Sequence, residues 1–370
     1  MALLATPVQV EDAAVRIRAD FPSVALSLVA IALALFAVRR KGTAGLVAAT
    51  LAGGVLAAAV AVKLLAVTAV VPVLAIMLLH RVGRLALALG AGAAAVVAAL
   101  LGVYATVLGP LWQDVVRFHL KAGSVPIQGA PTDLRGNFLK VVGVLTESQR
   151  LRSPFLWLVL VGAVGTLLAW RRRQLFDARI LWLWATATGA FLIWHRPLWA
   201  HDVVMLTVSL AVASGVGLAT LLVASRLVSR AAAAACVLVM AVTIAHHFQR
   251  ASSGESVGVE WAAAVLRTHT PQRSEVASDW PIIPFLANRR EPGALVDTSS
   301  TRLGSGWLTR AEILRAIDRD HVSAVVVAHY FAADPMLLHA LGARFPVVLR
   351  RNGVSLPGER SADIRIYLPR

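Results

Sequence analysis

The sequence contains one cysteine in 370 residues, Cys236, and this residue lies inside an apolar stretch. A single thiol excludes a disulfide or a cysteine-based metal site within one subunit. The N-terminal residues also lack the basic region and continuous apolar core of a secretory signal, because Glu11 and Asp12 closely follow the short apolar segment 2–7. The N-terminal sequence therefore predicts no cleavable signal peptide.

Signatures of several enzyme classes are missing as well. Gly90, Ala91 and Gly92 lie in an apolar helical pattern that follows no strand, so they do not match a phosphate-binding loop or a dinucleotide-binding motif. The sequence has no nucleophile elbow. The spacing of its serine, histidine and aspartate residues also gives no argument for a catalytic triad.

Apolar residues and positive charge are abundant. The apolar fraction is 58% and the mean hydropathy is +0.72, above the roughly 45–50% apolar content of soluble domains. Residues 1–249 hold 21 Lys and Arg against 8 Asp and Glu, and residues 250–370 hold 15 against 12, so +13 of the net +16 lies in the apolar part. This surplus is typical of membrane topology and lipid contact, whereas a nucleic-acid-binding protein concentrates it on a soluble face. We predict a polytopic membrane protein without a nucleic-acid partner.

Apolar segments near the length of a membrane-spanning helix, about 20 residues with a range of roughly 17–25, recur through the first two thirds of the chain. Eight are predicted: 22–38, 44–62, 64–79, 85–108, 155–170, 179–194, 203–225 and 231–247. Every second boundary between them carries arginine or lysine, namely residues 39–41, Arg81 and Arg84, residues 171–173, and Arg226 and Arg230. Because basic residues near spans stay in the cytoplasm, the loop 109–154 and the chain from His246 onward are predicted outside.

The last third of the chain changes to short β-branched runs that alternate with helical patterns. Strands are predicted near 275–277, 294–296, 322–328, 347–350 and 364–368. Thr309 and Glu312 have the spacing of a capping box at a helix start. The predicted fold is a polytopic α-helical membrane protein of about eight spans (1–249) with a C-terminal extracytoplasmic α/β domain (250–370). Two helices are predicted in the outer loop, near 111–121 and 134–145.

Ionisable residues at membrane depth or at its outer edge are costly, which makes each one a candidate for function. Asp20 follows Arg18 immediately before the first span, although an aspartate there can also serve as an ordinary N-cap. Lys63 stands alone between two apolar segments. Its ammonium group can hold a lipid phosphate or simply snorkel to the interface.

A third group of candidates lies between the sixth and seventh predicted spans and consists of His195, Arg196, His201 and Asp202. Convergent polar groups at a membrane interface indicate a functional site. The histidines and Asp202 lack a recognised metal-ligand spacing, so no metal site is predicted. The pair His246 and His247 is interpreted as a hinge between the last span and the outer domain.

Several of these stretches occur together in one known group of proteins. They are residues 18–22, 62–67, 118–120, 195–197 with His201, 278–281, 285–290 and 295–299. In these stretches the chain resembles the C-type glycosyltransferase superfamily, specifically the bacterial family 39-like enzymes related to protein O-mannosyltransferases and aminoarabinose transferase. The resemblance implies an enzyme of the bacterial plasma membrane that transfers a sugar from a polyprenyl-phosphate carrier, on the outer face, to an acceptor. It implies no cofactor besides this lipid-linked donor.

The resemblance also implies roles for the candidate residues. Outward-facing cations, here Lys63, Arg196, His201 and Arg18, would stabilise the anionic lipid phosphate as it leaves, with His195 and Asp202 as further candidates. A carboxylate would deprotonate the acceptor hydroxyl, and Asp20 lies nearest the expected position. In the family this base normally lies in the first outer loop, after the first span. The chain begins near the end of that region. Either N-terminal spans are missing from it, which is the alternative we favour, or it is a shortened relative that does not catalyse on its own.

Two other functions fit the composition. A non-catalytic scaffold or binding protein of the cell envelope would also have large outward-facing parts. A transporter would be expected to show charged or helix-breaking residues at mid-membrane depth and two similar halves. The predicted spans hold few such residues apart from Pro72, and the sequence shows no internal repeat.

Overall fold

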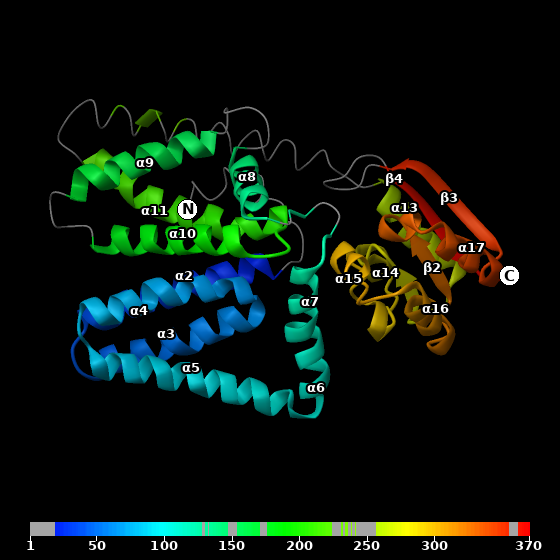
Figure 1. Cartoon of the computed structure of the whole chain (residues 1–370), viewed down its shortest axis with the longest axis horizontal. Helices are drawn as coiled ribbons and strands as arrows, with labels where there is room; N and C mark the ends of the chain where they lie inside the picture. Colours follow the sequence, from blue (N-terminus) through cyan, green and yellow to red (C-terminus); the bar gives the residue numbers. More distant parts are fainter. Residues whose placement is uncertain are drawn as a thin grey trace. The chain divides into compact units, whose positions relative to one another are not determined.

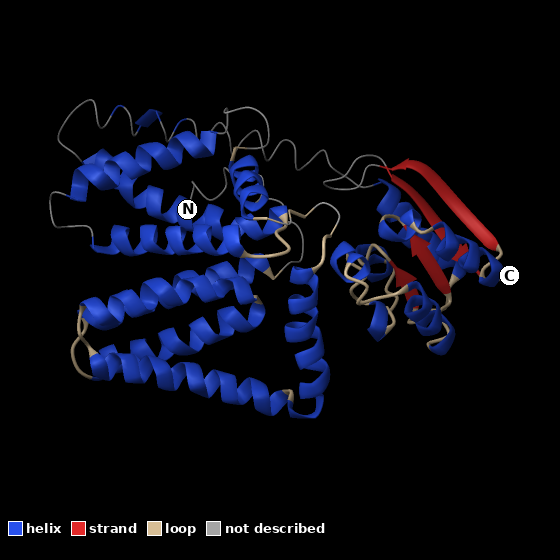
Figure 2. Cartoon of the chain, in the orientation of Figure 1, coloured by secondary structure: helices blue, strands red, loops and turns tan. Residues whose placement is uncertain are grey.

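The computed structural model describes residues 19–127, 130–131, 133–146, 154–170, 176–223, 257–354 and 362–370, with isolated positions between 231 and 241. It is mostly helical and contains one small sheet (Figures 1 and 2). The chain divides into two compact units. The helical unit comprises Met1–Asp114 and Ala130–Gln249, and the sheet unit comprises Val115–Gly129 and Arg250–Arg370. Part of the predicted outer loop thus belongs to the sheet unit.

The helical unit is built from apolar helices joined by short connections. Its elements are α2 (Asp20–Arg39), α3 (Thr43–Val62), η2 (Leu64–Ala69), α4 (Val70–Leu79), α5 (Gly83–Val103), η3 (Ala105–Val107), α6 (Leu108–Leu111), α8 (Leu134–Leu145), α9 (Pro154–Trp170), α10 (Phe176–Trp194), η5 (Ala200–Val203) and α11 (Val204–Val223). A π-helical turn, η4 (Trp112–Arg117), follows α6 and extends into the sheet unit.

Four helices in the described part of the chain are long and apolar enough to cross a membrane. They are α2, α3, α5 and the helix formed by η5 and the start of α11, Ala200–Ala219. Three predicted spans correspond to shorter apolar helices, Leu64–Leu79, Phe155–Leu168 and Ala178–Trp194. The eighth predicted span, 231–247, lies almost entirely outside the described residues.

Small residues bring pairs of helices into backbone contact. A Cβ at Gly53 of α3 would overlap the carbonyl of Leu89 in α5, and a Cβ at Gly92 of α5 would overlap the carbonyl of Thr50 in α3. Glycines at these positions allow the two backbones to approach closely, as in other membrane helix pairs. Much of the rest of α5 is exposed, including Leu87 and Val103, each about three quarters accessible. This exposure of apolar side chains is typical of a surface that faces lipid.

The sheet unit contains a four-stranded mixed sheet with strand order β1-β2-β4-β3. Its strands are β1 (Val276–Ser278), β2 (Ala324–Val327), β3 (Val347–Val354) and β4 (Ala362–Leu368); β1 and β2 are parallel, and the other two pairs are antiparallel. Its helices are α7 (Phe118–Ser124), α13 (Val257–His269), α14 (Ile282–Leu286), α15 (Ser300–Gly304), α16 (Arg310–Arg319) and α17 (Pro335–Arg344), with the 3-10 turns η6 (Gly293–Leu295) and η7 (Tyr330–Ala333).

Alternate residues of the strands pack into two separate cores, one on each face of the sheet. Val326 packs with α13 and α14, whereas its neighbours Val325 and Val327 pack with α16 and α17. This alternation follows from the two-residue period of a strand. Helices therefore cover both faces of the sheet (Figure 2). The arrangement explains why β2 is apolar at all four positions.

Most of the predicted strands of this unit are confirmed, and one is wrong. β2 lies within the predicted strand 322–328, and the capping box of Thr309 and Glu312 is present at the start of α16. The predicted strand 294–296 is instead the 3-10 turn η6. Pro292 and Gly293 favour a turn at this point, and the N–H of Leu295 closes it by donating to the carbonyl of Pro292 at 2.8 Å.

A buried carboxylate connects the ends of the two parallel strands. Asp279 follows β1 and is only 3% exposed. Its oxygens accept backbone N–H groups from the loop after β2: Ala328 at 2.7 Å, His329 at 2.9 Å and Phe331 at 2.7 Å. Because buried backbone donors need partners, Asp279 determines the path of the chain from β2 into η7. Its role in the sheet unit is structural.

We expect Asp279→Ala to lower the free energy of unfolding of the sheet unit by about 3 kcal/mol, because three backbone donors lose their acceptor. Pulse proteolysis of the detergent-purified protein measures this change, and hydrogen exchange should accelerate in the loop after β2. Asp318→Ala is the matched control: this exposed carboxylate pairs with Arg344 at 2.9 Å, and such pairs contribute about 0–1 kcal/mol. Equal effects of the two substitutions would contradict the structural role of Asp279.

Candidate functional site

One lysine side chain binds two buried aspartates at one end of the helical unit. The ammonium group of Lys63 donates to Oδ1 of Asp20 and to Oδ1 of Asp202, the second contact at 2.8 Å. Both aspartates are 5% exposed. Asp20 is the first residue of α2, Lys63 follows the end of α3, and Asp202 lies in η5. These three residues are called the carboxylate–lysine cluster below.

The local backbone explains how Lys63 reaches both partners. α3 ends at Val62, and Lys63 has an extended conformation (φ −154°, ψ 124°) before η2 begins at Leu64. This single extended residue interrupts the apolar helical run 43–79. The three cluster residues lie at the start of one span, the end of the next and the start of a third. Their contacts place these three helix ends together.

Asp20 and Asp202 differ in their remaining contacts. Asp202 uses both oxygens, because Oδ2 accepts the backbone N–H of Trp199 at 2.9 Å while Oδ1 faces Lys63 and also lies 3.6 Å from Nε2 of His201. Among the described residues, Oδ2 of Asp20 has no hydrogen-bond donor. Asp20 therefore retains an oxygen that can accept a proton, or a hydrogen bond from a hydroxyl group.

A side chain of α8 holds the turn that carries Asp202. Asn137 is fully buried, and its Nδ2 donates to the carbonyl of Ile193 at 2.9 Å and to that of His195 at 2.8 Å. Its Oδ1 is buried and has no partner among the described residues. The two hydrogen bonds fix the end of α10 and therefore the start of the loop that leads to Asp202.

Lys140 adds a second cation from the same helix. Its ammonium group lies 5.4 Å from the centre of the Trp199 ring. Burial lowers the pKa of Lys140, and the charge of Asp202 opposes this shift. Neither Lys140 nor Asn137 was identified as a site residue from the sequence. Asn137 and Lys140 are three residues apart in the predicted helix 134–145 and therefore lie on one face. This spacing is the feature of the sequence that could have identified them as a pair.

The predicted site residues fall into three groups. Asp20, Lys63, Asp202 and His201 lie together in or beside the cluster. Arg196 is exposed, and among the described residues it forms no ion pair; His195 stacks on Phe191 with ring centres 5.5 Å apart. Arg18 lies outside the described residues. Within the described part of the chain, no group of three His, Cys, Asp or Glu side chains has the geometry to hold a metal ion.

Arg289 of the sheet unit, which lies in the stretch 285–290 noted in the sequence, also has a structural role. Its guanidinium donates to Oγ1 and to the carbonyl of Thr270, both at 2.7 Å, and to the carbonyl of Ala287 at 2.8 Å. Thr270 follows the last residue of α13. Arg289 therefore neutralises the carbonyl groups at a helix C-terminus, where a cation is favoured.

Comparison of the sequence with protein-family models and with curated proteins finds no match. The chemical capacity of the site therefore follows from its geometry. Two carboxylates share one ammonium group in a place where water is largely excluded, with His201 and Lys140 close by. The ion pairs fix the carboxylates in position, and a carboxylate held in this way can serve as a proton acceptor.

We expect Lys63→Met to lower the free energy of unfolding by about 3–5 kcal/mol, because it leaves two buried carboxylates without a counter-charge. Denaturant titration in detergent micelles, followed by tryptophan fluorescence, measures the change. Lys41→Met is the control, since Lys41 is exposed on the same unit. This substitution should change the free energy of unfolding by less than about 0.5 kcal/mol. Adding Asp20→Asn and Asp202→Asn to Lys63→Met should restore part of the lost stability. No recovery in this triple variant would contradict the electrostatic origin of the effect.

Proposed function

We propose that the protein is a membrane glycosyltransferase that transfers a sugar from a polyprenyl-phosphate donor to an acceptor on the outer face of the membrane. The carboxylate–lysine cluster is the observation that carries this proposal. Charged groups at a membrane interface are costly and concentrate where function requires them. The likeness of residues 18–22, 62–67 and 195–197 to the C-type glycosyltransferases supports the same reading of the cluster.

In the proposed reaction Asp20 is the general base. The acceptor hydroxyl transfers its proton to the free oxygen of Asp20, and the acceptor oxygen forms a bond to the anomeric carbon of the donor sugar. The bond between that carbon and the phosphate oxygen breaks, and its electron pair remains on the polyprenyl phosphate. Asp202 is a positioning residue, because both its oxygens already have partners. Lys63 supplies the counter-charge for both carboxylates.

Cations beside the cluster would stabilise the departing lipid phosphate. Arg196 is exposed and carries no ion pair among the described residues. His201 lies 3.6 Å from Asp202, and the charge of Asp202 acts on Lys140. We assign phosphate binding to these three residues, together with Arg18. Lys63 is reassigned from phosphate binding to carboxylate binding, because its ammonium already serves Asp20 and Asp202.

The topology belongs to the same proposal. With about eight spans and the basic clusters in the cytoplasm, the cluster, the outer loop and the sheet unit face the exterior of a bacterial plasma membrane. A lipid-linked donor is accessible on that side. The expected partners are membrane lipid, the polyprenyl-phosphate sugar and an acceptor.

A non-catalytic envelope scaffold is the second candidate function. The observation that favours it is the complete pairing of Lys63 and Asp202 within the protein. In such a scaffold the cluster would serve only to fasten α2, α3 and η5 together. The two functions make different predictions for a substitution that preserves the fold and removes the base.

We expect Asp20→Asn to reduce sugar transfer by about 10²- to 10⁴-fold, because the amide cannot accept the acceptor's proton. The assay follows label from polyprenyl-phosphate mannose or glucose into the envelope fraction of membranes that contain the full chain. Lys63 keeps Asp202 as a partner in this variant, so the thermal unfolding temperature should change little. Asp114→Asn, an exposed carboxylate at the start of the π-helical turn, is the control and should transfer normally. Transfer by a folded Asp20→Asn variant within about threefold of the parent would contradict the role as base.

Labelling of single cysteines in intact cells tests the topology. In a Cys236→Ser background, Asp297→Cys in the sheet unit should react with a membrane-impermeant maleimide, whereas Lys41→Cys should react only after the membrane is opened. Both positions are exposed, so a difference in reactivity reports the side of the membrane. Reaction of Lys41→Cys in intact cells, with Asp297→Cys protected, would show the opposite orientation.

A further inference from the structure

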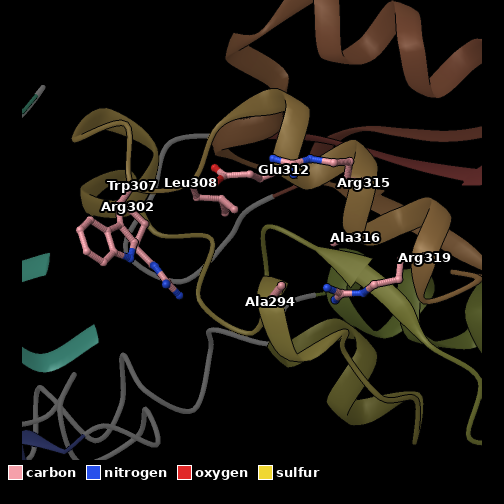
Figure 3. Close-up of a pocket in the computed structure, with 8 residues that line it drawn as sticks. All are labelled: Ala294, Arg302, Trp307, Leu308, Glu312, Arg315, Ala316 and Arg319. Atoms are coloured by element: carbon pink, nitrogen blue, oxygen red, sulfur yellow. The ribbon is translucent and has the colours of Figure 1, made fainter. Parts of the chain in front are cut away.

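The sheet unit contains a pocket of about 500 Å³, separate from the carboxylate–lysine cluster. Its lining residues are Ala294, Arg302, Trp307, Leu308, Glu312, Arg315, Ala316 and Arg319 (Figure 3). The volume is within the range of about 300–1,000 Å³ typical of small-molecule sites. Most such sites are lined mainly by apolar groups, whereas three arginines and a glutamate contribute to this one. The lining therefore selects a polar ligand.

One wall of the pocket is a single face of α16. Glu312, Arg315, Ala316 and Arg319 are spaced by three, four and seven residues, so they share one side of the helix. Arg302 and Trp307, in and after α15, lie together on another side of the pocket, and Ala294 of η6 lies near Arg319 (Figure 3). A ligand in the pocket would thus meet a guanidinium group on more than one side.

The charges leave the pocket positive. Arg319 forms two contacts of 2.6 Å with the carboxylate of Asp320. Glu312 uses Oε2 for the N–H and the hydroxyl of Thr309, both at 2.7 Å, and these hydrogen bonds hold the pKa of Glu312 below its usual range. In the lining itself, three guanidinium groups accompany one carboxylate. Arginine is well suited to oxyanions, because its planar fork matches carboxylate and phosphate groups.

Contacts with α7 order the aromatic side of the pocket. Lys121 donates to the carbonyl of Gly306 at 3.1 Å and lies 5.6 Å from the centre of the Trp307 ring. Phe118 lies 5.7 Å from Trp307 and 5.8 Å from the guanidinium carbon of Arg302. These contacts hold Trp307 and Arg302 before any ligand arrives, which lowers the entropy cost of binding.

We propose that this pocket binds an anionic sugar, that is, a sugar bearing a carboxylate or a phosphate group. The guanidinium groups of Arg302 and Arg315 bind the anion. The indole of Trp307 offers a flat apolar surface with a polar edge, which suits the face of a sugar ring. Oε1 of Glu312, which the capping box does not use, accepts a sugar hydroxyl. Binding of this ligand does not depend on the transfer reaction proposed above.

Calorimetric titration of the detergent-purified full chain tests the proposal. The probes are D-glucuronate for the carboxylate and glucose 6-phosphate for the phosphate, with glucose and inorganic phosphate as partial ligands. We expect saturable binding of at least one anionic sugar, at least about tenfold tighter than either partial ligand, and weaker in high salt. The two anionic probes distinguish between the carboxylate and the phosphate form of the ligand.

Matched variants locate the binding. Arg315→Met and Arg302→Met should each weaken it at least about tenfold, because each removes a charge-assisted hydrogen bond. Ala294→Leu should also weaken it by filling space without changing charge. Arg310→Met is the control: Arg310 lies in the same helix but pairs with Asp334 at 2.8 Å and does not line the pocket, so binding should stay within about twofold. Absence of saturable binding, equal loss in the control, or full retention in folded Arg315→Met and Ala294→Leu would overturn the proposal.

Discussion

The structure of the helical unit depends on one ammonium group that must serve two buried carboxylates. Removing three charges from water is expensive, and their mutual attraction compensates only if the geometry is close. The start of α2, the end of α3 and the turn η5 are therefore required to meet at Lys63. Other features make this meeting feasible: glycines let α3 approach α5, and Asn137 fixes the end of α10 before the loop to Asp202. The cluster links residues that are 43 and 139 positions apart in sequence.

The energetic cost of the carboxylate–lysine cluster indicates whether it serves stability alone. Well-packed apolar side chains of similar volume stabilise a protein as well as a buried ion pair does, or better. Stability alone therefore gives little reason to retain a lysine and two aspartates among apolar helices. Asp20 strengthens this argument, because one of its oxygens has no donor among the described residues. A cluster that served only to fasten helices would gain from satisfying that oxygen, whereas a general base requires it to be accessible.

The sequence predicts those features that depend on local pattern. Apolar runs predict the helices, β-branched runs predict β2, and the spacing of Thr309 and Glu312 predicts the start of α16. Asp20, Lys63 and Asp202 were each identified from their cost at a membrane edge. Their contacts could not be predicted in the same way, because these depend on how helices distant in sequence pack together. The prediction of a strand at 294–296 was wrong, because the turn preference of Pro292 and Gly293 outweighed the strand preference of the apolar residues.

Other features escaped prediction because they join distant segments. Val115–Gly129 reads as part of a loop between spans, yet it belongs to the sheet unit, where Lys121 and Phe118 contact Trp307. Asn137 is an ordinary helix residue until the carbonyl groups of Ile193 and His195 lie beside it. Tertiary hydrogen bonds of this kind leave no periodic signal in the sequence. The sequence indicates such residues only through their spacing, which places polar side chains on the same face of a helix.

The two units use charge in physically different ways. In the helical unit the charges are buried and paired with one another, so their ion pairs hold each carboxylate at a fixed position, as the proposed proton transfer requires. In the sheet unit the arginines of α16 are exposed, and water screens their mutual repulsion. An exposed arginine that binds an anion gives up only part of its hydration. The desolvation cost of binding is therefore smaller than the cost of burying a charge during folding, and this favours reversible binding. The environment of the charged side chains, more than their type, therefore distinguishes the proposed catalytic site from the proposed binding pocket.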